Sequence, residues 1–233
     1  MAISLQEYQL LDNPGWHALQ TTHRQFAAGT DAIQRYPADV LRIAACARPS
    51  IANLHAIEPW VSPGEKVFIV GDIPPLPENW TNYINIDCTQ MVCPKLKSIA
   101  VKEQVTIQLL KGDDHEEMIA LINLVQPGFF FKNTYQLGDY FGIRKDGKLV
   151  AVAGERLKMT GLTEVSAVVT HPDYTGRGYA QQLVYHVSVK NFEEGNTPFL
   201  HLLTTNERAK KVYELVGFEE RRVIPFCGLQ RNY

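Results

Sequence analysis

Two glycines separated by one residue stand where a predicted strand gives way to a predicted helix. The stretch TEVSAVVTHPDYTGRGYA, residues 163–180, begins as a β-branched strand, turns at a proline and continues into residues with helical spacing. Gly176 and Gly178 allow a ligand to approach the backbone closely, and the free N–H groups at a helix start attract anions. Arg177, between them, adds a positive charge on the solvent side. These are the physical requirements of a pyrophosphate-binding loop.

An ordinary tight turn would explain the same two glycines. A Walker loop requires a Lys followed by Ser or Thr, which is absent here, and a dinucleotide fingerprint requires a third glycine where this chain has Gln181. The loop alone therefore leaves open a turn, a coenzyme site and a site for another phosphate ligand.

The elements that must position this loop follow one another regularly. We expect a strand over residues 105–110, a helix from Asp113 and a hairpin of two strands joined at Asp146-Gly147. The strand at 163–170 and the loop come next, followed by a buried strand at 199–203. A last helix starts near Asn206 and ends at Gly217, as a C-cap glycine predicts.

This order of elements and motifs resembles the GNAT superfamily of N-acetyltransferases. The signature of the superfamily is Gln or Arg, two residues, Gly, one residue and Gly or Ala, followed later by N-x-x-A-x-x-x-Y-x-x-x-G-F, which NERAKKVYELVGF (206–218) matches. EVSAVVTHPDYTGRGYA and AGERL look like the branch related to glycine N-acyltransferases. The resemblance is good from about residue 105 and faint before residue 100. One departure is Asp173 at the first motif position, because an acidic side chain cannot donate to phosphate.

The resemblance implies an α/β (α+β) fold with a mixed, largely antiparallel sheet that splays between its fourth and fifth strands. We expect residues 101–233 to form the GNAT domain and residues 1–100 to form a smaller α/β half, a degenerate companion. Acetyl-CoA is the implied co-substrate. The residues implied to bind it are Val168, Val169 and Thr170 in the strand, then Thr175, Gly176, Arg177, Gly178, Tyr179 and Ala180 through the loop, and Asn206.

Acyl transfer to an amine also needs an oxyanion donor, a base and an acid. The resemblance implies a backbone N–H near Val168 as the oxyanion donor. Glu164 is the candidate base, directly or through a water, and a solvated or ion-paired strand carboxylate is the alternative. On a regular strand Glu164, Ser166, Val168 and Thr170 share one face. Tyr213 is the candidate acid that protonates the coenzyme sulfur, although helical spacing alone would make it a core residue.

Several other residues have a weaker claim to the site. Glu155 is the reserve base or an ammonium ligand, His171 is expected to be structural, and His201 is expected to be a core histidine. Phe129, Phe130, Phe131 and Tyr135 in one loop could line the acceptor pocket or simply cover the core. The pocket is favoured, because three adjacent phenylalanines cannot all point inward.

Composition limits the partners. There are 23 basic and 25 acidic residues, a net charge of −2, which argues against duplex nucleic acid. The four cysteines form no zinc pattern, so we expect no metal and free thiols in a reducing cytoplasm. The start MAISLQEYQLLDNP does not look like a signal peptide, and no apolar run is long enough to span a membrane. Assembly as a homodimer is left open.

The sequence therefore predicts an acetyl-CoA-dependent N-acetyltransferase that acts on a small-molecule amine or amino acid by direct transfer. The first alternative is a non-catalytic acyl-CoA-binding regulatory module, which Asp173 leaves open. The second is a domain that binds another nucleotide through the glycine loop.

Overall fold

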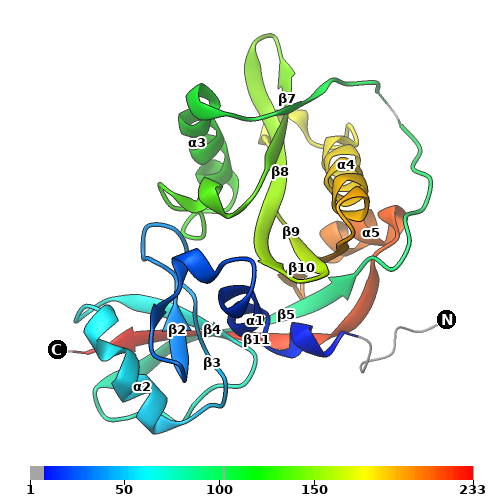
Figure 1. Ribbon diagram of the computed structural model, residues 1–233. Helices are drawn as coiled ribbons and strands as arrows, with labels where there is room; N and C mark the ends of the chain where they lie inside the picture. The colour runs from blue at the N-terminus through cyan, green and yellow to red at the C-terminus, as the bar shows by residue number, and fades with distance from the viewer. Residues whose placement is uncertain (1–7, 102, 233) are drawn as a thin grey trace.

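An eight-stranded sheet forms the framework of the molecule in the computed structural model, which describes residues 8–101 and 103–232 (Figure 1). Its strand order is β4-β11-β5-β10-β9-β8-β7-β6. The strands are β4 (Lys66–Val70), β5 (Trp80–Val92), β6 (Ile107–Leu109), β7 (Tyr140–Lys145), β8 (Lys148–Met159), β9 (Leu162–Thr170), β10 (Thr197–Leu203) and β11 (Glu219–Arg231). All neighbouring pairs are antiparallel except β9 and β10. The mixed, largely antiparallel sheet predicted from the sequence is confirmed.

The two strands of the parallel pair separate after a short paired segment. Residues 197–199 of β10 pair with residues 162–164 of β9, and beyond them the two strands have no further paired residues. β9 nevertheless continues to Thr170 and β10 to Leu203. The sheet therefore splays between the fourth and fifth strands counted from residue 105, as predicted.

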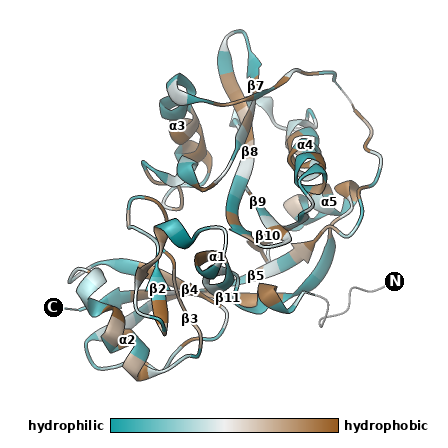
Figure 2. Cartoon of the chain, viewed as in Figure 1, coloured by the Kyte–Doolittle hydropathy of each residue, from teal (hydrophilic) through white to brown (hydrophobic). Residues whose placement is uncertain are grey.

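Helices cover both faces of the sheet. α3 (His115–Val125) and α4 (Tyr179–Glu193) pack against opposite sides of β8 and β9 (Figure 1), and α5 (Glu207–Val216) lies beside α4. Each helix combines apolar and polar residues (Figure 2), so that one side can be buried. The turn between β7 and β8 has both central residues at positive φ, 49° at Asp146 and 79° at Gly147, as the Asp-Gly pair predicts.

The first hundred residues add a small layer and two strands of the main sheet. A three-stranded sheet of β1 (Ala28–Gly29), β2 (Ile33–Arg35) and β3 (Ala44–Cys46) packs with α1 (Pro14–Gln20) and α2 (Ile51–Ile57). Short 3-10 helices are Gln9–Asp12, Arg24–Phe26, Glu58–Trp60, Gly112–Asp114, Thr134–Leu137 and Pro172–Tyr174. β5, which the sequence did not predict, lies between β10 and β11. The sheet is thus continuous across residue 100, and the division into 1–100 and 101–233 stays a prediction.

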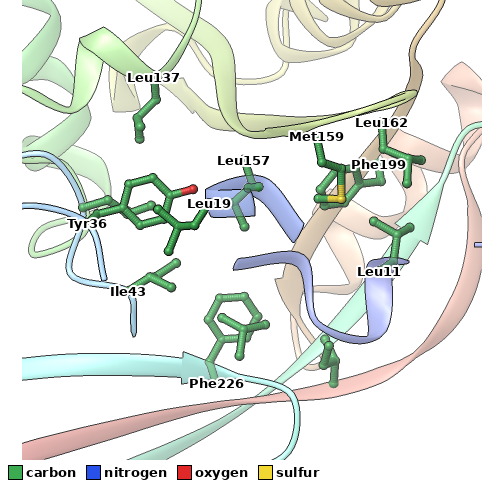
Figure 3. Packing of buried hydrophobic residues seen from close by; sticks show 14 of the residues in the cluster. Leu11, Leu19, Tyr36, Ile43, Leu137, Leu157, Met159, Leu162, Phe199 and Phe226 are labelled. Atoms are coloured by element: carbon green, nitrogen blue, oxygen red, sulfur yellow. The ribbon is translucent and has the colours of Figure 1, made fainter. Parts of the chain in front are cut away.

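A buried cluster joins the two parts of the chain (Figure 3). Leu11, Leu19 and Tyr36 from the first part meet Leu157 and Phe199 from the second, and all five side chains are fully buried. Because these contacts link residues far apart in the sequence, the first hundred residues stabilise the sheet that carries the glycine loop.

Three expectations from the sequence, namely no membrane span, no metal site and free thiols, can be compared with the described residues. In that part of the chain, no helix is long and apolar enough to cross a bilayer. No group of three or more potential metal ligands comes together among the same residues. Cys46, Cys88, Cys93 and Cys227 are buried and unpaired. Residues 1–7, the first half of the stretch examined for a signal peptide, lie outside the described residues.

Candidate active site

A cavity of about 410 Å³ lies where β9 and β10 separate. Its wall is mostly apolar and comes from β5, α3 and the loop after it, β7, β8, β9, β10, α5 and β11. Contributing residues include Ile86, Cys88, Phe129, Phe130, Arg156, Val165, Ser166, Ala167, Val168, His201, Asn206, Tyr213 and Phe226. The predicted site residues Val168, Asn206 and Tyr213 therefore share one cavity, although the sequence separates them by up to 45 positions.

A β-bulge opens β9 toward this cavity. Gly154 pairs with Ser166 and Val152 with Val169, so that Ala167 and Val168 lie outside the regular register opposite one residue of β8. Ala167 has φ of 51°, a conformation unusual for a residue with a Cβ. Because β10 has already diverged, the backbone of Ala167 and Val168 lines the cavity. A ligand could therefore pair with backbone groups at the position predicted for the oxyanion donor.

The bulge also corrects the predicted faces of β9. The sequence placed Glu164, Ser166, Val168 and Thr170 on one face, which strict alternation requires. In the structure Val165 and Val168 both pack toward α4, and Val169 packs toward α3. The extra residue at the bulge reverses the alternation after Ser166. The shared-face prediction is therefore wrong for Val168 and Thr170.

The glycine loop has the geometry that the sequence predicted. Gly176 and Gly178 have φ of 81° and 83°, and a Cβ added at either would meet no atom within 4 Å. Gly178 is the N-cap of α4 and makes no side-chain cap hydrogen bond. The first N–H groups of α4, at Tyr179 and Ala180, consequently have no acceptor within the helix. The open backbone fits an anionic ligand such as a pyrophosphate.

The other loop residues contribute unequally. Arg177 lies over the ring of Tyr174, with its guanidinium carbon 5.1 Å from the ring centre. The hydroxyl of Thr175 donates to the carbonyl of Pro172 at 3.2 Å, so its side chain is already bonded within the loop. The side chain of Tyr179 is buried and donates to Glu103 at 2.9 Å. Tyr179 can therefore bind a ligand only through its backbone, and the ligand roles of all three stay predictions.

Glu164 is fully buried in an ion-paired network beside the cavity. Its carboxylate accepts two hydrogen bonds from Arg156, from Nε at 2.8 Å and Nη2 at 2.6 Å, and one from the backbone N–H of Leu157 at 3.3 Å. The Nδ1 atom of His201 lies 2.7 Å away and completes the set. These four contacts occupy all the lone-pair positions that a carboxylate offers.

Charge compensation keeps Glu164 ionised. Burial alone raises the pKa of this carboxyl, but the guanidinium of Arg156 and the hydrogen bond of His201 outweigh burial and lower the pKa to about 2. Such an environment matches the ion-paired alternative to the general base. The base role stays a prediction, and a base at this position would have to exchange one of its four partners for water.

His201 is held on its other side as well. Gln90 Nε2 donates to the backbone carbonyl of Leu11 at 2.8 Å and lies 3.0 Å from His201 Nε2, and Gln90 Oε1 accepts from Arg221 at 2.7 Å. With the amide oriented in this way, Nε2 of His201 accepts and Nδ1 donates to Glu164. The ring is 2 % exposed and lines the cavity, so His201 is both a satisfied histidine and part of the site wall.

Tyr213 and Asn206 form the side of the cavity nearest α5. Burial raises the pKa of Tyr213 to about 12, which keeps its hydroxyl protonated at neutral pH, as an acid requires. Asn206 Oδ1 accepts from the backbone N–H of Ala209 at 3.1 Å and caps α5, while the residue still reaches the cavity. Both residues line the cavity, and their roles as acid and coenzyme ligand stay predictions.

The reserve candidates lie outside the cavity wall. Glu155 is fully buried and bonded to Lys158 at 2.8 Å and Lys190 at 3.0 Å. His171 Nδ1 accepts from the backbone N–H of Asp173 at 3.3 Å and caps a 3-10 turn, which is a structural role. The side chain of Asp173 is 82 % exposed and lies 3.7 Å from His171 Nδ1.

The aromatic loop divides its residues between the cavity and its surroundings. Phe129 and Phe130 line the cavity, as predicted for acceptor-pocket walls. The guanidinium carbon of Arg42 instead lies 4.7 Å from the centre of the Phe131 ring. The ring of Tyr135 stacks on that of His115, with the ring centres 3.9 Å apart. Sequence reasoning missed Arg156, Ile86, Cys88 and Phe226 in the wall. Of these four, only Arg156 could have been suspected from the sequence, because it follows Glu155 on the strand that pairs with the strand of Glu164.

Comparison with known proteins gives the context of this geometry. The FR47-like protein family matches residues 140–226. The N-alpha-acetyltransferase RimI of Mycobacterium tuberculosis is 32% identical over 99 residues, and the match spans 40% of this chain and 56% of that protein. A solved structure of a GNAT-family protein from Novosphingobium aromaticivorans is 27% identical, with a TM-score of 0.85 over 96% of this chain and 99% of that chain.

A GCN5-related N-acetyltransferase from Kribbella flavida is similar in fold, with a TM-score of 0.65 over 98% of this chain and 96% of that chain at 17% identity. Both structures extend over the first hundred residues as well as the glycine loop. The whole architecture, with its N-terminal part, therefore recurs in other proteins.

Proposed function

We propose that this chain, which belongs to the GNAT superfamily and has the GNAT acetyltransferase fold, transfers the acetyl group of acetyl-CoA to the nitrogen of a small amine or amino acid. One observation carries the proposal: the splay of β9 from β10 and the bulge at Ala167 open backbone groups into the cavity that also holds Tyr213. Acetyl-CoA as the co-substrate is implied by the superfamily.

The residues of this chain can bind such a thioester in two places. The open N–H groups after Gly178 suit the pyrophosphate, and the unpaired backbone of β9 at Val168 suits the amides of the pantetheine arm. The same N–H region can polarise the thioester carbonyl. Asn206 lies on the opposite wall, at the start of α5.

The transfer itself forms a carbon–nitrogen bond and breaks a carbon–sulfur bond. The neutral amine attacks the thioester carbonyl carbon, the tetrahedral intermediate collapses, and the sulfur leaves as the electron pair returns to the carbonyl. Tyr213, protonated and in the cavity wall, donates its proton to the departing thiolate. The amine must lose a proton, to Glu164 through an exchanged water or to bulk solvent.

Two similarities narrow the class of acceptor in this proposal. Resemblance to the glycine N-acyltransferase branch favours an amino-acid acceptor. The RimI relative is named as an N-alpha-acetyltransferase, which favours an α-amino group and offers a protein N-terminus as a second candidate acceptor.

A reducing cytoplasm is the proposed location, supported by the four unpaired cysteines. We propose small-molecule substrates with neither nucleic acid nor membrane as partner, and leave a homodimer open.

Calorimetric titration of the purified protein with acetyl-CoA, with ATP as the control ligand, tests the site. Micromolar binding of acetyl-CoA and no binding of ATP are expected. Release of free thiol in the presence of amines then distinguishes an enzyme from a non-catalytic acyl-CoA-binding module. Failure of acetyl-CoA to bind would refute the function, and binding of ATP instead would favour another nucleotide.

A further inference from the structure

Arg156 uses only one edge of its guanidinium in the ion pair. Nε and Nη2 each donate to the carboxylate of Glu164, which leaves both hydrogens of Nη1 and the second hydrogen of Nη2. Among residues 8–101 and 103–232, no hydrogen-bond acceptor is found for these three hydrogens. The side chain is 15 % exposed and lines the cavity. The unused edge can therefore bind an anion there with two parallel hydrogen bonds.

The network behind Arg156 fixes this edge in place. Glu164 is anchored by His201 as well as by the backbone N–H of Leu157, and His201 is anchored by Gln90. Because each member is bonded on both sides, the guanidinium loses little freedom when a ligand binds. The network therefore holds the guanidinium of Arg156 rigidly at the cavity wall.

No acidic side chain balances Arg156 from within the cavity. Among the described residues that line it, Arg156 is the one with a permanently charged side chain, and Glu164 lies behind the guanidinium. An acceptor with several positive charges would find no carboxylate in the cavity wall and would meet the N–H donors of a guanidinium whose charge Glu164 already compensates. A carboxylate on the acceptor would instead find complementary hydrogen-bond donors.

The wall around Arg156 is apolar. Ile86 and Cys88 from β5, Phe226 from β11 and the loop residues Phe129 and Phe130 contribute to it. Removing an apolar side chain from water against such a wall is favourable by about 25 cal/mol per Å². The cavity thus combines one anion-binding fork with an aliphatic and aromatic surface, the usual composition of a small-molecule site.

We infer that the acceptor is an α-amino acid with an apolar or aromatic side chain, and that Arg156 binds its carboxylate. The inference rests on the proposed function and names its substrate class. Arg156 is a specificity-determining residue, and Glu164 and His201 position it. The amino group is then free to face the bulge at Val168, where the thioester carbonyl would lie.

Matched acceptors test the carboxylate. Thiol release from acetyl-CoA is measured with phenylalanine, leucine, phenylalaninamide, phenethylamine, a phenylalanyl dipeptide and spermidine. We expect kcat/KM for phenylalanine to exceed that for phenylalaninamide and for phenethylamine by about tenfold or more, as hydrogen bonds to a charged group imply. Equal values for the acid and the amide, or a preference for the dipeptide or spermidine, overturn the inference alone. No transfer to any amine overturns the proposed function and the inference with it.

Variants of Arg156 test whether this residue binds the carboxylate of the acceptor. Arg156→Lys keeps the charge and loses the fork, and the double variant Arg156→Gln/Glu164→Gln removes both charges so that neither is left buried alone. In both, the preference for phenylalanine over its amide should fall toward unity through KM, while the Kd of acetyl-CoA stays unchanged. Arg24→Gln, at an exposed arginine outside the cavity, is the matched control. A folded double variant that retains the full preference contradicts the role of Arg156.

Discussion

A carboxylate without solvent contact stays charged only when its partners replace water. Glu164 achieves this with a bidentate guanidinium, an imidazole and a backbone N–H. Breaking such a buried pair by removing one partner typically costs about 3 to 5 kcal/mol, because the other charge remains buried. At the residue scale, the contacts of Glu164 therefore predict a role in stability whatever its role in catalysis.

Glu164→Gln should lower the free energy of unfolding at neutral pH by about 3 kcal/mol. The pKa of Glu164 is lowered from 4.5 to about 2 in the folded state, so its stabilisation is present above pH 4.5 and lost as the pH falls toward 2. The difference between wild type and variant should therefore shrink across that window. Urea unfolding at a series of pH values measures it.

Glu220→Gln, at a surface carboxylate paired with Lys210, is the control and should change stability by less than about 1 kcal/mol. A constant difference between wild type and Glu164→Gln from pH 5 to 2 would contradict the ion-paired assignment. The same variant tests the base role: a fall in kcat at neutral pH with an unchanged Kd for acetyl-CoA would support Glu164 as the base.

Tyr213→Phe should reduce kcat by about 100-fold, at the lower end of what general acid catalysis contributes. The pKa of the hydroxyl is raised to about 12 by burial, so wild-type activity should show no alkaline limb from Tyr213 below pH 10. Removal of the hydroxyl leaves the ring and its packing, so the Kd of acetyl-CoA should hold. Thiol release and calorimetry on the two proteins measure this. An unchanged kcat would exclude the acid role.

At the scale of elements, local signals predicted much of what surrounds the site. The Asp146-Gly147 turn, the glycine loop and the Gly217 C-cap each have the backbone conformation that their residues favour. β5 was missed because Asn82, Asn85 and Asp87 are poor strand formers. It is a strand because β10 and β11 pair with its two edges, which no local pattern reports.

The bulge and the cavity escaped prediction for a related reason. Ala167 adopts a positive φ, which a glycine at this position would have indicated in the sequence. The surrounding strands impose this conformation on an alanine. The cavity joins Cys88, Arg156, His201 and Phe226, which meet only once the sheet has formed. The loop and helix residues of the proposed coenzyme site could thus be predicted from sequence, whereas the rest of the cavity wall needed the fold.

Gly178→Ala should weaken acetyl-CoA binding by about tenfold, the equivalent of one lost hydrogen bond to a charged group. A Cβ at φ of 83° also strains the backbone, which costs about 1 to 2 kcal/mol of stability. Gly195→Ala, with φ of 77° just after α4 and open space around it, carries the same strain without a ligand nearby. Calorimetry should show weaker binding for the first variant only. Equal affinities would mean that the loop is only a turn.

At the scale of the whole molecule, the two parts of the chain are interleaved. β5 pairs with β10 along residues 88–92 and with β11 along almost its entire length. His23, which is 2 % exposed, lies 3.0 Å from the hydroxyl of Tyr36 and 3.1 Å from the carbonyl of Leu137. The cavity takes Ile86 and Cys88 from the first hundred residues. Under the proposed function, both parts of the chain therefore contribute to substrate specificity.

A fragment of residues 101–233 should fail to fold as a monomer. Without β4 and β5, β11 loses the partner strands on both of its edges and β10 loses the partner on one edge. The buried cluster loses Leu11, Leu19 and Tyr36 at the same time. Circular dichroism and acetyl-CoA titration of the fragment, alone and with residues 1–100 added, measure the effect. The full chain should unfold in one transition, and the two fragments together should recover binding. A folded fragment that binds acetyl-CoA by itself would show instead that the remaining sheet is stable without β4 and β5 and that residues 1–100 serve only the acceptor.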